Sequence, residues 1–211
     1  MPSNAADLPA LLSRAKASYQ AGAFGHAIVG YTAVLQLDPS NIEAYLGRAW
    51  AHRDSKDFQR AIEDFSSAIQ RNGNLADAYE GRGVCHGEIG DLDKAMADFN
   101  EALRLDPENY LAYYDRGLIY MKRNQSITAI EEFDQAIKRN PQYPYAYQYR
   151  GMVRYGLGAY EKALEDFTEA VRLAPDLEES RTMRSRTMDR LRERSIVAQE
   201  APDLPAVGLR S

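Results

Sequence analysis

The sequence repeats itself with a 34-residue period. Three columns return at this spacing in five copies: a small residue, an aromatic residue four positions later, and a residue that closes the copy. The small column is Ala27, Ala61, Ala95, Ala129 and Ala163, and the aromatic column is Tyr31, Phe65, Phe99, Phe133 and Phe167. The closing column is Pro39, Gly73, Pro107, Pro141 and Pro175. Self-similarity at a fixed period is typical of a repeat architecture, so one continuous array is expected.

Each copy is expected to form two helices. In the first, an aromatic or aliphatic residue is followed four residues later by a small one, as in Tyr79 and Gly83, which puts both on one helix face. In the second, an aliphatic residue such as Leu103 follows the aromatic column at the same spacing and extends its apolar stripe. Glycine or asparagine between the two helices tolerates a left-handed cap. The turn positions are Gly22, Lys56, Gly90, Asn124 and Gly158.

The pattern resembles the tetratricopeptide repeat, whose signature is an aromatic residue, a small residue, then Ala-x-x-x-Phe and a closing proline in each repeat. The resemblance covers residues 8–175. It implies an all-α fold, a right-handed superhelical α-solenoid of five tandem 34-residue helix-turn-helix repeats with the first helices on its concave side. The expected repeats are 8–41, 42–75, 76–109, 110–143 and 144–177.

The two ends depart from the repeat. Residues 1–7 are expected to form a short N-terminal lead-in. After Pro175 the columns stop, yet residues 177–196 keep a sparse apolar stripe that is typical of a helix. A terminal repeat needs a polar outer surface, so this segment is expected to be a C-terminal capping helix. Residues 197–211 are expected to be a disordered tail.

Composition narrows the function classes. Hydrophobic residues make up 45% of the chain and charged residues 27%, with a formal charge of −5, so no basic excess indicates nucleic acid. No window approaches the ~18 uninterrupted apolar residues of a membrane span. No secretory signal is recognisable at the N-terminus. The single cysteine, Cys85, rules out an internal disulfide and fits a reducing compartment. A cytoplasmic protein without a membrane partner is therefore expected.

No catalytic motif is recognisable. The sequence lacks His-Glu-x-x-His, paired Cys-x-x-Cys and a glycine-rich phosphate loop. His52 and His86 lie one period apart, so they are expected to be partly buried packing residues, with a metal site beside Cys85 as the alternative. The chain is therefore expected not to be an enzyme and to carry no cofactor or metal.

Charge also follows the period. An arginine recurs in every first helix, and a carboxylate follows sixteen residues later in four of the five copies. The arginines are Arg14, Arg48, Arg82, Arg116 and Arg150, and the carboxylates are Asp64, Asp98, Glu132 and Asp166. A ladder of partly buried ion pairs that sets the repeat register is expected. A phosphate-binding stripe is the alternative.

The first helices carry a second apolar face. At 100° per residue, Leu46 and Trp50 lie ~100° and ~140° around the helix from Tyr45, away from the partner helix. A helix that is apolar on both sides is either covered on both or displays a binding surface. These positions are expected to line a groove, and packing between adjacent first helices is the alternative for each of them. The candidate groove residues are Leu46, Trp50, Asp77, Glu80, Val84, Tyr114, Asp115, Leu118, Met121, Tyr149, Met152 and Tyr155.

The predicted function is a non-enzymatic protein–protein interaction scaffold that binds a peptide segment in this groove. The segment is expected to be apolar or aromatic, and acidic residues in the middle of the array favour a basic one. The resemblance excludes a chaperone-tail adaptor, because Asp77 and Asp115 fall at positions where such family members grip a carboxylate with cations.

Two other function classes stay open. The chain could form a homo-oligomer through the exposed stripe or the C-terminal helix. That helix also carries six arginines against four acids between residues 178 and 194, so it could bind nucleic acid or an acidic partner. Nucleic acid is the less favoured partner.

Overall fold

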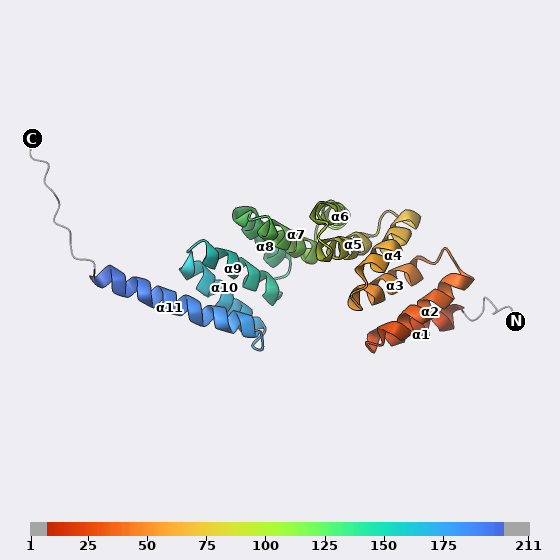
Figure 1. Cartoon of the computed structure of the whole chain (residues 1–211), viewed down its shortest axis with the longest axis horizontal. Coiled ribbons are helices and arrows are strands. Elements are labelled where there is room, and N and C mark those ends of the chain that lie inside the picture. The colour runs from red at the N-terminus through yellow and green to blue at the C-terminus, as the bar shows by residue number, and fades with distance from the viewer. Residues whose placement is uncertain (1–7, 201–211) are drawn as a thin grey trace, which may run out of the picture. The chain divides into compact units, whose positions relative to one another are not determined.

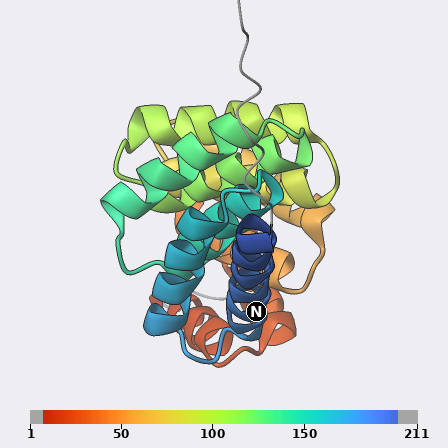
Figure 2. The same ribbon diagram turned by 90° about the vertical axis from the view of Figure 1, so that its left-hand side faces the viewer.

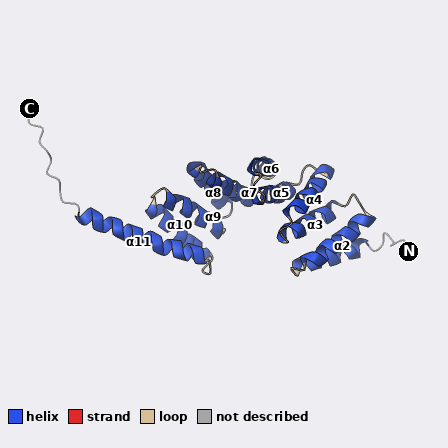
Figure 3. Ribbon diagram, viewed as in Figure 1, coloured by secondary structure: helices blue, strands red, loops and turns tan. Residues whose placement is uncertain are grey.

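The computed structural model describes residues 8–200, and every regular element in that part of the chain is a helix (Figures 1 and 3). The expected lead-in, 1–7, and residues 201–211 of the expected tail lie outside the described residues. The helices are α1 (Leu8–Gln20), α2 (Phe24–Leu37), α3 (Ile42–Asp54), α4 (Phe58–Arg71), α5 (Ala76–Glu88), α6 (Leu92–Leu105), α7 (Tyr110–Lys122), α8 (Ser126–Arg139), α9 (Pro144–Gly156), α10 (Tyr160–Leu173) and α11 (Glu178–Glu200).

The helices form pairs in chain order, which confirms the expected all-α repeat fold. The odd-numbered helices up to α9 are the first helices of the repeats, and the even-numbered ones are the second helices. The chain divides into two compact units, Met1–Ile119 and Tyr120–Ser211, here called the N-terminal unit and the C-terminal unit, and each is described by itself. In the N-terminal unit, α1 packs on α2, α3 on α4 and α5 on α6; in the C-terminal unit, α9 packs on α10.

All five predicted turn residues adopt a left-handed backbone. Glycine occupies three of these positions, but Lys56 has a φ of 62° and Asn124 a φ of 57°. A side chain with a Cβ is strained in this region, and asparagine tolerates it better than lysine does. Lys56 is therefore the turn residue least suited to its conformation.

Replacing Lys56 with glycine is expected to raise the free energy of unfolding by about 0.5–1 kcal/mol, because the strain at its Cβ disappears. Urea-induced unfolding of the full chain measures the effect. The matched control is Glu63→Gly, at an exposed position inside α4, which should lower the free energy of unfolding by about 1 kcal/mol. A loss of stability in both variants would contradict the assignment.

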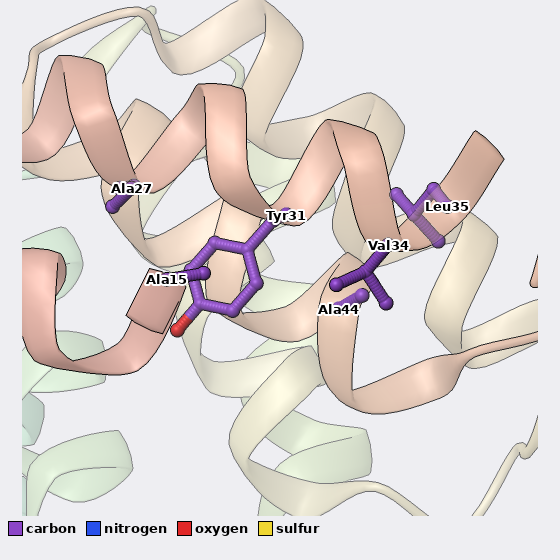
Figure 4. Packing of buried hydrophobic residues seen from close by; sticks show 7 residues of the cluster. Ala15, Ala27, Tyr31, Val34, Leu35 and Ala44 are labelled. Atoms are coloured by element: carbon purple, nitrogen blue, oxygen red, sulfur yellow. The ribbon is translucent and has the colours of Figure 1, made fainter. Parts of the chain in front are cut away.

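The aromatic column forms the core of the helix pairs. Its members are between 0% and 3% exposed, and the alanine column is fully buried. In the first pair, Tyr31 and Val34 project from α2 towards Ala15 and Ala44 (Figure 4). The small residues of the first helices make room for these rings: a Cβ on Gly83 would lie 2.7 Å from Cε1 of Phe99. Close packing of a ring against bare backbone therefore joins the two helices of a repeat.

Arg48, Arg82 and Arg150 form the ion pairs that were predicted for their copies. Arg48 donates to Asp64 through Nε (2.8 Å) and Nη2 (2.7 Å), and Arg82 binds Asp98 in the same bidentate way, at 2.9 and 2.6 Å. The remaining Nη1 donates sixteen residues backwards, to the second helix of the preceding repeat. Its acceptors are Thr32 for Arg48, Ser66 for Arg82, Asn100 for Arg116 and Asp134 for Arg150. Each of these arginines thus bridges two repeats, which fixes their register.

The two periodic histidines lie beside this ladder. His52 is 7% exposed and His86 is 8% exposed, and burial lowers the pKa of both. They are packing residues, as predicted. Residues 8–200 hold no group of three or more histidine, cysteine or carboxylate side chains suited to a metal ion.

Helix α11 begins one repeat period after the start of α9 and packs mainly on α10 (Figure 2). Ser180 lies one period after the buried Ala146 and is itself fully buried; its Oγ donates to Oε1 of Gln148 (2.9 Å). The helix continues to Glu200, so residues 197–200 are helical where a disordered tail was expected. None of the described helices has the length and apolar character needed to cross a membrane.

Candidate functional site

The predicted groove residues divide between the two units. Most are half-buried, but Asp77 is exposed and Glu80 is buried. Those in the N-terminal unit are Leu46, Trp50, Asp77, Glu80, Val84, Tyr114, Asp115 and Leu118, and those in the C-terminal unit are Met121, Tyr149, Met152 and Tyr155.

Trp50 is held between three helices of the N-terminal unit. From α3, its ring meets Phe65 of α4 edge-on, with 4.8 Å between centroids. Its Cη2 approaches α5 so closely that a Cβ on Gly81 would lie 2.6 Å away. Packing, the alternative considered for every groove residue, therefore accounts for part of the Trp50 surface. Its remaining surface is partly covered by Arg53, whose guanidinium carbon lies 4.3 Å from the ring centroid.

Arg53 and its neighbours form a polar network on the same side of α3. The guanidinium of Arg53 binds Oδ1 of Asp54 through Nε (2.9 Å) and Nη2 (2.8 Å). The hydroxyl of Tyr19, on α1, donates to the other oxygen of Asp54 at 2.6 Å. Burial and this hydrogen bond raise the pKa of Tyr19 to about 12, so it stays a neutral donor. The charge of Arg53 is therefore already matched by Asp54.

Two acidic side chains lie within reach of this network and have no partner in the described chain. Glu80 on α5 is 8% exposed, and no hydrogen bond or ion pair joins it to another described residue. Burial, with a contribution from Asp77, raises the pKa of Glu80 to about 7, against the opposing charge of Arg53. Asp115 on α7 also lacks a hydrogen bond or ion pair within the described residues. Burial and the charge of Glu80 raise its pKa well above the usual value.

These acids follow from local helix geometry. Val84 lies one turn after Glu80 on α5, and Leu118 lies three residues after Asp115 on α7, so each carboxyl shares a helix face with an apolar residue. Sequence reasoning placed Glu80 and Asp115 on this face but did not predict the burial of Glu80. The feature of the sequence that indicates this burial is the adjacent Gly81, because the absence of a Cβ there lets the Trp50 ring approach α5.

Two of the predicted groove residues in the C-terminal unit make aromatic contacts within that unit. Tyr149 stacks on Phe133, with 6.3 Å between ring centroids. Tyr155 packs against Tyr160 of α10, with 5.2 Å between ring centroids, and its hydroxyl raises the pKa of Arg190 on α11. Helix α11 thus contacts part of the predicted groove surface. Met121 and Met152 are half-buried.

Comparison with protein families finds a sequence model described as "Tetratricopeptide repeat" that matches residues 46–110 and 114–178. A comparison with curated proteins finds no match.

Solved structures with the same architecture include MamA, which is 26% identical to this chain, with a TM-score of 0.68, over 79% of this chain and 91% of MamA. A second is PilF of Pseudomonas aeruginosa, 19% identical, with a TM-score of 0.79, over 91% of this chain and 87% of that chain. A third is YrrB, described as a TPR protein with an unusual peptide-binding site. It is 19% identical, with a TM-score of 0.64, over 83% of this chain and 90% of that chain.

Proposed function

The chain belongs to the tetratricopeptide repeat family, and we propose that it is a non-enzymatic scaffold that binds a segment of a partner protein on one face of the N-terminal unit. This surface, the first-helix face, consists of side chains from α3, α5 and α7. Its members are Leu46, Trp50, Asp77, Glu80, Val84, Tyr114, Asp115 and Leu118.

The observation that carries the proposal is the mixed chemistry of this face. Half-buried apolar and aromatic side chains surround two acids that have no partner within the described chain. Surfaces that bind peptides combine apolar anchors with a few polar groups in this way. YrrB, which has the same fold, is described as having a peptide-binding site. A cytoplasmic location belongs to the same proposal, because a single cysteine that cannot form an internal disulfide fits a reducing compartment.

Replacing Tyr114 with alanine is expected to weaken partner binding by about 2 kcal/mol, roughly thirtyfold in Kd, because a half-buried aromatic anchor is lost. A partner peptide is first selected from a displayed peptide library with the full chain. Its affinity for each variant is then measured by calorimetry.

The matched control is Ile127→Ala, which removes an exposed apolar side chain from a second helix of the C-terminal unit. Its Kd should equal that of the unchanged chain. Equal affinity of the Tyr114→Ala variant, with an intact helical spectrum, would show that the first-helix face is not the binding surface.

The arginine-rich helix α11 is the alternative binding surface. Some of its arginines already pair with acids one turn away, since Arg190 lies 3.0 Å from Glu193 and Arg192 lies 3.5 Å from Asp189. This pairing lowers the positive charge that α11 offers to nucleic acid, so the first-helix face is the preferred surface.

A further inference from the structure

We infer that the first-helix face is specific for a cationic side chain of the partner segment, a lysine or an arginine, which the carboxyl groups of Glu80 and Asp115 bind together. This inference rests on the proposed function and adds to it the chemistry of the partner.

The first step is the state of Glu80. A glutamate that is only 8% exposed and makes no hydrogen bond in the described chain keeps little of its hydration, which is unfavourable for its charged form. Trp50 helps to cover this part of α5, because its indole lies over the neighbouring Gly81. A bound cation would therefore stabilise the charged form of Glu80 more than it would stabilise that of an exposed glutamate.

The second step concerns Asp115 on α7. The negative charge of Glu80 is among the causes that raise the pKa of Asp115, so the two carboxyls lie within electrostatic range of each other. Two unpaired carboxyls within electrostatic range repel each other when both are ionised. A positive charge bound beside them removes that repulsion and gains two charge-assisted hydrogen bonds.

The third step concerns the cation already present. Arg53 acts on both acids, but its guanidinium is bonded to Asp54 and stacked on Trp50. Among the described charges that act on Glu80, Asp115 and the nearby Cys85, Arg53 is the one cation, and the acids outnumber it. They are Asp54, Asp77, Glu80 and Glu88. A cation supplied by a partner would reduce this excess of negative charge.

The fourth step separates a side chain from a metal ion. No set of side chains suited to holding a metal occurs in residues 8–200. Beside the two carboxyls lie Val84 and Leu118, one turn or less along the same helices. An alkyl stem that ends in a charged group matches this combination, because lysine and arginine bury their stems on apolar surface.

The test uses three short probes and the isotope-labelled full chain, followed by NMR. The probes are acetyl-Leu-Arg-Leu-amide, its lysine analogue, and its citrulline analogue, which keeps the shape of arginine without the charge. The arginine and lysine peptides should shift amide signals of residues 77–88 and 111–118, and the citrulline peptide should bind about tenfold more weakly. Comparison of the two cationic peptides shows whether a guanidinium or an ammonium is preferred.

The variants Glu80→Gln and Asp115→Asn should each remove the difference between the arginine and citrulline peptides. The control Glu63→Gln changes an exposed glutamate on α4 and should preserve it. Equal binding of the charged and uncharged peptides to the first-helix face would overturn the inference and leave the proposed function standing. Absence of any shift on that face at millimolar concentrations of all three peptides would count against both.

Discussion

Exchanging Asp166 for alanine is expected to lower the free energy of unfolding by about 3–5 kcal/mol, because two largely buried arginines lose the carboxylate that they share and Arg150 keeps only the more exposed Asp134. The side chain of Asp166 is 2% exposed and accepts from Arg150 through Nη2 (2.6 Å) and from Arg154 through Nη1 (2.8 Å). The two arginine side chains are only 15% and 17% exposed, so water cannot replace the lost carboxylate fully. The two positive charges would then remain close together, with only the half-exposed Asp134 paired to Arg150.

The matched control is Asp134→Ala. Asp134 binds the same guanidinium through Nη1 of Arg150, but its side chain is 45% exposed. An exposed pair of this kind contributes about 1 kcal/mol or less. Urea-induced unfolding gives the total loss, and hydrogen exchange in α9 and α10 locates it in the C-terminal unit. A small and equal cost for both substitutions would mean that burial does not strengthen this ladder.

The arginine ladder shows what a period in the sequence can predict. The carboxylate sixteen residues after each arginine is visible because its chemistry is the same in four copies. The acceptor sixteen residues before it is not visible, since Thr32, Ser66, Asn100 and Asp134 share no residue type. Any side-chain oxygen at that position can accept a hydrogen bond from Nη1 of the arginine. The position of the acceptor is therefore periodic, while its residue type varies.

The first-helix face shows what helical spacing in the sequence cannot predict. Helical spacing predicts which residues share this face, and Leu46, Val84 and Leu118 are half-buried there. Spacing within one helix cannot predict how deeply a neighbouring helix covers a residue, and the burial of Glu80 depends on such a neighbour. Likewise, spacing places Tyr155 on the groove face but does not predict that it acts on Arg190 of α11, whose pKa its hydroxyl raises. The columns of the repeat end before α11, so they carry no information about where that helix packs.

Replacing Glu80 with glutamine is expected to stabilise the N-terminal unit above pH 7, by up to about 3 kcal/mol. The pKa of Glu80 is raised from 4.5 to about 7 in the folded chain, so the folded state holds a proton that the unfolded state has already lost. The unchanged protein should therefore lose stability as the pH rises from about 4.5 to about 7. Glutamine keeps the shape of the protonated acid and has no proton to lose.

The measurement compares urea-induced unfolding of both proteins between about pH 5 and pH 8. Trp50, the single tryptophan, reports on the N-terminal unit by its fluorescence. The groups that face Glu80 are Arg53 on α3, Asp77 on α5 and Asp115 on α7, and the substitution leaves all three in place. The two buried histidines, whose pKa values burial lowers, are common to both proteins, so the difference in free energy reports on Glu80 and on its effect on Asp115.

The control Glu63→Gln should follow the unchanged protein at every pH, because this glutamate is exposed. The stability difference for Glu80→Gln should instead grow from about pH 5 to about pH 7.5 in favour of the variant. The same proton links stability to binding, since a cationic side chain beside Glu80 would favour its ionised form. Parallel pH profiles for the two proteins would mean that Glu80 is already paired or hydrated in solution, and the argument for a cation from a partner would lose its first step.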